Sequence, residues 1–309
     1  MQVFRGRRGA FGAPVALTIG NFDGVHLGHQ AMLARLCEAS RALVLPAAVL
    51  TFEPQPREFF SPGTAPARLT TLREKLECLA KYGVDRAHII RFNGEFAALS
   101  PDTFVSQLLV EKLNVRWLLV GDDFRYGAQR GGDYAQLARA AERCGFQLES
   151  MQSVNIAGER VSSTAVREAL ARGDFAHAQR LLGRPYTIEG RVAHGEKLGR
   201  RLGFPTANIH LQRKRAPFTG IYAVKLHGVE SKPLPAVASL GVRPTVMADA
   251  APVLEVHVLD FSADIYGRRV RVEFLHKLRD EEKYPDLESL RQQIERDVEH
   301  ARQYLKSDV

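Results

Sequence analysis

The periodicity of the apolar residues changes once along this chain of 309 residues, close to Gly183. Before that point, short apolar runs alternate with segments whose apolar residues recur at helical spacing, which indicates βαβ units and a mostly parallel sheet. After it, apolar and polar residues alternate in runs that glycine or proline separates, which is typical of antiparallel strands. The sequence therefore predicts two domains of different fold class, residues 1–183 and residues 184–309.

The first half contains four apolar runs that we expect to be strands and six segments that we expect to be helices. Ligands of parallel sheets bind beyond the carboxyl ends of the strands, so the residues that follow these runs are candidate site residues. The expected strands are residues 15–19, 42–51, 87–92 and 116–120, and the expected helices are residues 30–42, 72–82, 101–113, 134–144, 163–172 and 174–182.

The second half contains six runs with a period of two and no helical segment between them, which predicts a small antiparallel barrel or sandwich. Only its end is helical, where Leu287, Leu290 and Ile294 begin an apolar face and Asp286 is an expected N-cap. The six expected strands are residues 186–192, 206–211, 221–226, 234–240, 253–261 and 268–275.

The segment Gly20–His29 stands between the first expected strand and the first expected helix. A helix N-terminus offers unpaired N–H groups and a positive dipole end, and glycines let a polyphosphate approach the backbone. His26 and His29 share one face of the first turn, where they can stabilise the charge on a departing pyrophosphate. The pattern His-x-Gly-His therefore predicts nucleotidyl transfer; the alternative is a pair of surface histidines beside a glycine turn.

A second glycine-rich segment, residues 190–208, joins two expected strands and carries several basic residues. Its glycines free backbone N–H groups to surround phosphate, and its basic side chains add charge. Thr206 and Asn208 follow as alternate residues on one face, and their oxygens suit Mg²⁺. The predicted phosphate-binding residues of this loop are Gly195, Lys197, Gly199, Arg200 and Gly203; the alternative is a basic loop followed by an ordinary strand.

Glu255 interrupts an apolar run, and strand alternation places it on the face opposite Leu254, Val256 and Val258. A carboxylate at a barrel mouth can take the proton from an attacking hydroxyl. An acid on a solvated outer face gives the same pattern, so the alternation leaves both alternatives open.

Composition and net charge indicate the class of protein but do not identify its ligand. No apolar run is long enough to span a membrane and no signal peptide is recognisable, so we expect a cytoplasmic protein that does not bind membranes. The net charge of +8 suits anionic partners, which include nucleotides and nucleic acids. The basic residues concentrate in the glycine loop and are not interleaved with aromatic residues on strands, so we expect no nucleic-acid partner.

These motifs together resemble the bacterial bifunctional riboflavin kinase and FAD synthetase family over nearly the whole chain. In the first half, Gly20–His29 is similar to the family's ATP loop, residues 121–127 to its flavin-side loop, and residues 160–167 to its second phosphate motif. The resemblance implies a Rossmann-like nucleotidyltransferase domain whose catalytic residues are His26, His29 and Arg167. It further implies phosphate contacts from Gly20, Phe22, Asp23, Gly24, Gly28, Arg160, Ser163 and Thr164, and flavin contacts from Asp123, Phe124 and Tyr126.

In the second half, residues 203–208, 220–222 and 241–245 resemble the family's kinase motifs, and Glu255 stands where the family has its catalytic base. The resemblance implies a riboflavin kinase on a β-barrel with a C-terminal helix, with Mg²⁺ on Thr206 and Asn208. The substrates would be riboflavin, FMN and ATP, and the oligomeric state stays open. Three residues depart from the family pattern: Gln55, Asp123 and Ser239.

Two other functions remain possible on the sequence alone. The His-x-Gly-His turn also serves transfer to other acceptors, such as nicotinamide mononucleotide or phosphopantetheine, although the kinase-like half makes FMN the expected acceptor. A basic chain with a small barrel is also compatible with a nucleic-acid binder, whose affinity would fall steeply with salt.

Overall fold

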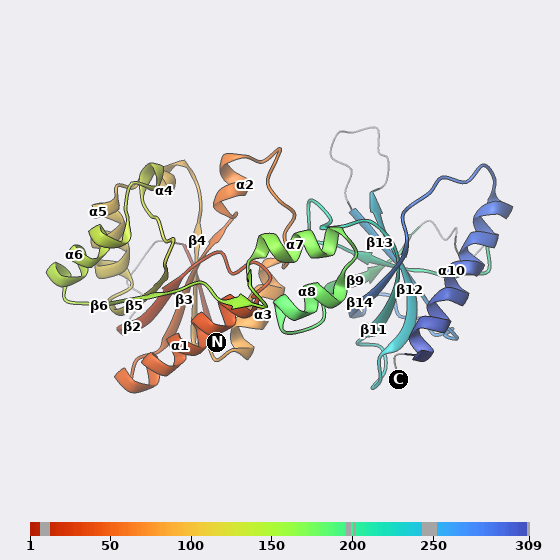
Figure 1. The fold of residues 1–309 in the computed structure, drawn as a ribbon, viewed down its shortest axis with the longest axis horizontal. Coiled ribbons are helices and arrows are strands. Elements are labelled where there is room, and N and C mark those ends of the chain that lie inside the picture. The colour runs from red at the N-terminus through yellow and green to blue at the C-terminus, as the bar shows by residue number, and fades with distance from the viewer. Residues whose placement is uncertain (7–12, 196–198, 200–201, 243–251, 308–309) are drawn as a thin grey trace. The chain divides into compact units, whose positions relative to one another are not determined.

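The computed structural model describes residues 1–6, 13–195, 199, 202–242 and 252–307, and it divides the chain into two compact units (Figure 1). The first unit consists of Met1–Pro66 and Leu72–Ser162. The second consists of Ala67–Thr71 and Ser163–Val309.

The first unit is built on a parallel sheet with the strand order β1-β4-β3-β2-β5-β6. The prediction of a parallel sheet is confirmed, and its central strands overlap the apolar runs. The strand expected at residues 42–51 starts only at Ala47, because Ala42 and Leu43 still belong to the preceding helix. The edge strands β1 and β6 were not predicted, because they are short and mostly exposed or half-buried and so carry no apolar run. The strands are β1 (Gln2–Arg5), β2 (Val15–Ile19), β3 (Ala47–Glu53), β4 (Arg86–Arg91), β5 (Val115–Gly121) and β6 (Gln147–Met151).

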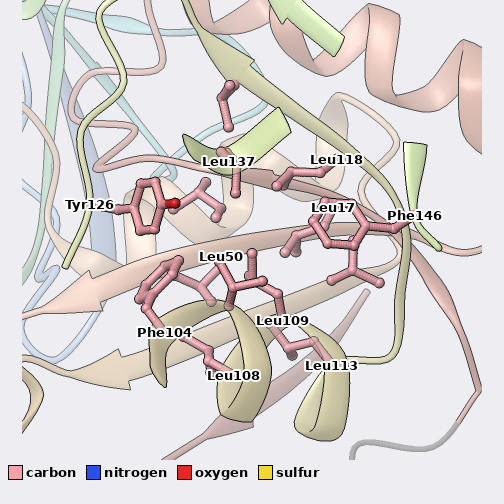
Figure 2. Close-up of a cluster of buried hydrophobic side chains, with 14 of the residues drawn as sticks. Leu17, Leu50, Phe104, Leu108, Leu109, Leu113, Leu118, Tyr126, Leu137 and Phe146 are labelled. Atoms are coloured by element: carbon pink, nitrogen blue, oxygen red, sulfur yellow. The ribbon is translucent and has the colours of Figure 1, made fainter. Parts of the chain in front are cut away.

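Helices cover both faces of this sheet, because its central strands are apolar on both sides (Figure 1). Along β2, Leu17 packs toward one cluster and Ala16 toward the other. Figure 2 shows the cluster around Leu17, which Leu50 and Leu118 of neighbouring strands and Phe104 complete. One face carries α1 (Leu27–Leu43) and α3 (Leu72–Lys81); the other carries α4 (Gly94–Ala97), α5 (Pro101–Thr103), the π-helix η1 (Phe104–Lys112) and α6 (Tyr134–Cys144).

Smaller elements complete the first unit. The short helix α2 (Pro56–Phe60) follows β3, a 3₁₀ turn η2 (Ala128–Arg130) precedes α6, and β7 (Asn155–Ile156) pairs with β8 (Glu159–Arg160). The segment predicted as one helix over residues 101–113 begins as α5 and continues as the π-helix η1. Ser100 caps it as expected, since the N–H of Thr103 donates to its hydroxyl at 3.1 Å.

The second unit contains a closed antiparallel barrel with the strand order β10-β13-β12-β11-β14-β9. This confirms the antiparallel prediction and decides for a barrel over a sandwich. The helix α10 (Leu287–Ser307) lies against the outside of the barrel, where Ala301 and Leu305 pack on Ile221 and Val237, and Asp286 caps it through the N–H of Ser289 at 2.7 Å (Figure 1). The strands are β9 (Thr187–Ala193), β10 (Ala207–His210), β11 (Gly220–His227), β12 (Leu234–Val242), β13 (Pro252–Val258) and β14 (Arg269–Arg279).

Helices α7 (Ser163–Ala171) and α8 (Phe175–Leu182) belong to the same compact unit as the barrel. Phe175 of α8 lies with its ring centroid 5.3 Å from that of Phe218, 5.5 Å from Tyr222 and 5.9 Å from Phe274. These aromatic rings are almost fully buried, so α8 closes one end of the barrel core. The functional boundary between residues 183 and 184 stays a prediction.

Candidate functional site

The turn between β2 and α1 is buried and conformationally restricted. Phe22, Gly24 and Val25 all have positive φ angles, of 48°, 81° and 42°. Phe22 and Val25 have no exposed surface, and Asp23 is 2% exposed. Non-glycine residues keep such angles only where their surroundings impose them, which is common at functional sites. The fold therefore holds the backbone of this turn in one shape.

His26 and His29 lie together at the start of α1, as their spacing predicts. Their rings stack with centroids 3.6 Å apart and planes inclined by 19°. His26 is the N-cap, and its Nδ1 accepts the backbone N–H of His29 at 3.3 Å. Because that nitrogen is an acceptor, the proton of the neutral His26 ring lies on Nε2. A side chain on Gly28 would come within 3.2 Å of the His26 ring, so glycine is needed for this close approach.

His29 is held in its neutral form. Burial lowers its pKa well below 6.5, and the neighbouring His26 and Lys75 lower it further. Among the residues that the structure describes, none forms a hydrogen bond with its buried Nδ1. A neutral imidazole at a helix N-terminus can donate a hydrogen bond to phosphate without competing for a proton.

The loop after β5 brings several predicted residues together. The guanidinium of Arg160 donates to the Asp123 carboxylate at 2.8 Å, although the family resemblance implies a phosphate role for Arg160 and a flavin role for Asp123. Both side chains are more than half exposed, so this ion pair adds little stability. Phe124 stacks on Tyr126 with centroids 5.7 Å apart, and Tyr126 is only 5% exposed. Of the two rings, Phe124 is the more accessible.

An aromatic cluster that sequence analysis missed lies at the carboxyl ends of β3 and β4. The ring of Phe92 is 5.8 Å from that of Phe52, 5.5 Å from Phe59 and 5.6 Å from Phe60, each in an edge-to-face arrangement. Phe60 is 64% exposed and Phe59 38% exposed, which is unusual for such large apolar rings. The signal in the sequence is the pair Phe59-Phe60, which stands two residues after the Glu53-Pro54-Gln55-Pro56 segment.

Ser163, Thr164 and Arg167 open α7 and belong to the second compact unit. The guanidinium of Arg167 is held in place by two backbone carbonyls: its Nε donates to Ala67 at 2.7 Å, and its Nη1 donates to Ser163 at 3.1 Å. This fixes the cation over the first turn of α7.

In the barrel, Asn208, Glu255 and Ser239 form one row across three adjacent strands. Asn208 of β10 is the register partner of Glu255 on β13, and Glu255 is the register partner of Ser239 on β12. On β13, Leu254, Val256 and Val258 are buried, and Glu255 alternates with them, as predicted. The row therefore faces outward from the barrel.

Two cavities adjoin this row, and Thr206 lines both. A cavity of about 240 Å³ lies between the barrel and α10 and is lined by Thr206, Glu255 and Ser239, with Ile294 and Val298 on the helix. Glu255 therefore lies on the outer face of the barrel, as the second alternative predicted, but α10 covers this part of the face. A second cavity of about 170 Å³ is lined by Thr206, Val192 and Tyr266.

The glycine loop packs against the two oxygen-bearing side chains. A side chain on Gly195 would collide with the Asn208 amide, and one on Gly199 would come within 3.2 Å of the Thr206 hydroxyl. Lys197 and Arg200, which the sequence also assigned to this loop, lie outside the described residues, as do residues 243–245. Gly203 has a φ of 89°, so it provides a left-handed turn ahead of Thr206.

The cavity between the barrel and α10 is rich in carboxylates. Glu281 and Glu282 line it together with Glu255, and the buried Asp297 accepts the guanidinium of Arg279 at 2.7 Å. Burial raises the pKa of Glu281, and Arg279 opposes this. Negative charge repels phosphate, so this cavity suits an uncharged ligand better than a nucleotide.

Two other features are absent from the described residues. No cluster of three or more histidine, cysteine or acidic residues is arranged to hold a metal ion. No described helix combines the length and the apolar character that crossing a membrane requires.

Comparison with known proteins gives matches over both halves. The family model for FAD synthetase matches residues 11–165, and that for riboflavin kinase matches residues 182–305. A bifunctional riboflavin kinase/FMN adenylyltransferase of Escherichia coli (strain K12) is 50% identical over 307 residues, covering 98% of each chain. One of Pseudomonas fluorescens is 52% identical over 285 residues, covering 92% of this chain and 91% of its own.

A solved structure also matches the whole chain. The crystal structure of a macrolide-efflux protein from Streptococcus pneumoniae has a TM-score of 0.81 at 27% identity, and the match covers 98% of this chain and 99% of that one.

Proposed function

The chain belongs to the bifunctional riboflavin kinase/FMN adenylyltransferase family, and on that premise we propose which residues serve each step. The enzyme uses ATP to make FMN from riboflavin and FAD from FMN. The stacked His26–His29 pair carries the assignment of the adenylylation site. The row of Asn208, Glu255 and Ser239 beside two cavities carries the assignment of the kinase site.

In adenylylation, a phosphate oxygen of FMN attacks the α-phosphorus of ATP, and the bond from that phosphorus to the bridging oxygen breaks to release pyrophosphate. The nucleophile is already anionic, so the site has to offset charge repulsion and needs no strong base. His26 and His29 donate hydrogen bonds to the phosphates at the N-terminus of α1. Arg160, which belongs to the same compact unit, supplies a further donor, and the phosphate roles that the family resemblance implies for Ser163, Thr164 and Arg167 of the second unit stay predictions.

We propose that the flavin ring of FMN stacks on accessible aromatic side chains at the carboxyl edge of the sheet. Phe124 was assigned to the flavin from the sequence, and the exposed rings of Phe59 and Phe60 offer a further apolar surface. Tyr126 is almost fully buried, so it supports Phe124 from the side of the protein interior.

In the kinase reaction, the 5′-hydroxyl oxygen of riboflavin attacks the γ-phosphorus of ATP, the bond to the β–γ bridging oxygen breaks, and ADP leaves. We assign riboflavin to the carboxylate-rich cavity under α10, because it is uncharged, and ATP to the cavity beside Val192 and Tyr266. Thr206 lines both cavities, so the two substrates meet there. Glu255 lines the riboflavin cavity and accepts the proton of the attacking hydroxyl.

Mg²⁺ fits the donor set of this site. The Thr206 hydroxyl and the Asn208 amide oxygen are hard ligands, and the glycine loop packs directly against both. ATP phosphates and waters would complete the shell that Mg²⁺ prefers. When bound, the ion neutralises charge on the phosphates, while Glu255 handles the proton.

A crossed assay of two variants tests both assignments. His29→Ala should lower FAD formation from supplied FMN by roughly 10²-fold while riboflavin phosphorylation is unchanged. Glu255→Gln should lower riboflavin phosphorylation by roughly 10²- to 10⁴-fold while supplied FMN is still converted to FAD. Products are resolved by chromatography after incubation with ATP and Mg²⁺.

The exposed helix variant Glu295→Gln is the control and should match the parent in both assays. Near-normal FAD synthesis by His29→Ala, or near-normal FMN synthesis by Glu255→Gln, would remove that residue from its site.

A further inference from the structure

Lys75 is fully buried in the first unit, which is rare for a lysine. It lies on α3 and has no exposed surface. Burying an ammonium group is unfavourable, so a protein keeps one there only where surrounding groups or function favour it. Lys75 belongs to none of the sequence motifs described above.

Two hydrogen bonds connect this ammonium to the phosphate turn. Lys75 Nζ donates to the Thr51 hydroxyl at 3.4 Å, and that hydroxyl donates to the backbone carbonyl of Asn21 at 3.4 Å. Thr51 is itself fully buried near the carboxyl end of β3. The cation therefore lies behind the Gly20–His29 turn and not on its solvent side.

The same cation acts on the imidazole pair. Burial has the largest effect on the pKa of His29, and His26 and then Lys75 lower it further. A fixed positive charge favours the neutral form of a nearby imidazole and also attracts the phosphates that this imidazole contacts.

We propose that Lys75 is a positioning residue for adenylylation: from behind the turn it fixes the backbone at Asn21 through Thr51 and directs a positive field toward the His26–His29 pair and the triphosphate. The proposal rests on the assignment of these histidines to the adenylylation site. Because Lys75 is buried, it acts through the turn and the histidines and does not contact substrate.

The reason for a buried cation is the charge that develops on pyrophosphate as it leaves. A charge fixed in a low-dielectric interior acts more strongly than an exposed one, which water and salt screen. It also needs no rearrangement during the reaction, which is the main advantage of a preorganised site.

The test replaces the charge and follows His29 directly. Lys75→Met removes the charge and the donor, and Lys75→Gln removes the charge but keeps a donor for Thr51. In both variants, the NMR titration midpoint of the His29 ring should move to higher pH, and kcat for FMN adenylylation should fall by roughly 10-fold or more. Riboflavin phosphorylation should not change, because that reaction uses the barrel.

Lys81→Met is the matched control, since it removes the same charge from the exposed end of the same helix. It should leave both the His29 titration and adenylylation as in the parent. The fluorescence of Trp117, the single tryptophan, reports whether the first unit of each variant is folded.

The proposal is overturned if His29 titrates in both Lys75 variants as in the parent, or if both variants keep near-normal adenylylation. It is also overturned if Lys81→Met has the same effects as the Lys75 variants, or if neither Lys75 variant folds. His29→Ala in the same assay separates this failure from failure of the site assignment. If His29→Ala makes FAD normally, the site itself is misplaced; if it is inactive while the Lys75 variants are normal, only the role of Lys75 is wrong.

Discussion

His88 lies fully buried in the middle of β4, and its ring stacks on that of Phe4 with centroids 5.0 Å apart. Burial lowers its pKa to about 4, with a smaller effect from Arg86. The unfolded chain, in which a histidine has a pKa near 6.5, therefore binds more protons than the folded one between about pH 6.5 and pH 4. Within that window, the free energy of unfolding decreases as the pH falls.

We expect this residue alone to lower the stability of the first unit by about 3 kcal/mol between pH 7 and pH 4. His88→Leu should remove that part of the pH dependence, since it leaves no proton to bind. Urea unfolding followed by Trp117 fluorescence at several pH values measures it, because Trp117 is buried in the same sheet.

His300→Gln is the control, because His300 is exposed on α10 in the other unit. If His88→Leu and the parent lose stability equally on acidification, protonation of His88 is not the cause.

At the scale of elements, the loop between β9 and β10 depends on the absence of side chains at two positions. A Cβ on Gly195 would collide with the Asn208 amide, and one on Gly199 would press on the Thr206 hydroxyl. The loop thus supports the oxygens that we assign to Mg²⁺, and its glycines serve close approach as well as phosphate binding.

We expect Gly195→Ala to lower riboflavin phosphorylation by roughly 10-fold or more, because the added methyl displaces the Asn208 amide. The apparent affinity for Mg²⁺ should weaken in the same variant, which a titration of kinase rate against Mg²⁺ concentration measures. Gly63→Ala, whose Cβ would meet no atom within 4 Å, controls for the general effect of this substitution. A Gly195→Ala enzyme with normal kinase activity and Mg²⁺ dependence would contradict a supporting role for this glycine.

At the scale of the whole molecule, the compact units do not begin where the apolar periodicity changes. Helices α7 and α8 precede residue 184, yet the ring of Phe175 on α8 packs against Phe218, Tyr222 and Phe274. The hydroxyl of Tyr186 also donates to the carbonyl of Leu69, at 3.1 Å. The compact unit that contains the barrel therefore includes two chain segments that precede the barrel strands in the sequence.

We expect two fragments to differ in stability. Residues 184–309 should fold and phosphorylate riboflavin without making FAD, as the predicted boundary requires. Residues 163–309 should do the same but melt at least about 5 °C higher, because they keep Phe175 over the end of the barrel core. Thermal unfolding by circular dichroism and a kinase assay of both fragments measure this.

Equal melting temperatures would show that Phe175 adds nothing to the isolated barrel. An unfolded shorter fragment beside a folded longer one would move the working boundary to the start of α7.

Local patterns determined much of this protein. Apolar runs located the central strands β2, β3, β4 and β5, period-two alternation located the barrel strands, and helical spacing located most helices, because burial on one or both faces imposes a pattern on the residues themselves. The edge strands β1 and β6 left no such trace, since an edge strand buries little apolar surface and is held by pairing with its neighbour.

The residue types at the two sites were also predictable, since glycines, imidazoles and hard oxygen ligands are what phosphate and Mg²⁺ require. Alternation put Glu255 opposite Leu254, but it could not say which face meets a ligand; closure of the barrel and packing of α10 on its outside decided that. The burial of Lys75 behind the phosphate turn was likewise invisible in the sequence. A periodicity records how one segment divides its own faces, whereas a cavity or a buried charge depends on segments far apart in the chain, which only the tertiary structure brings together.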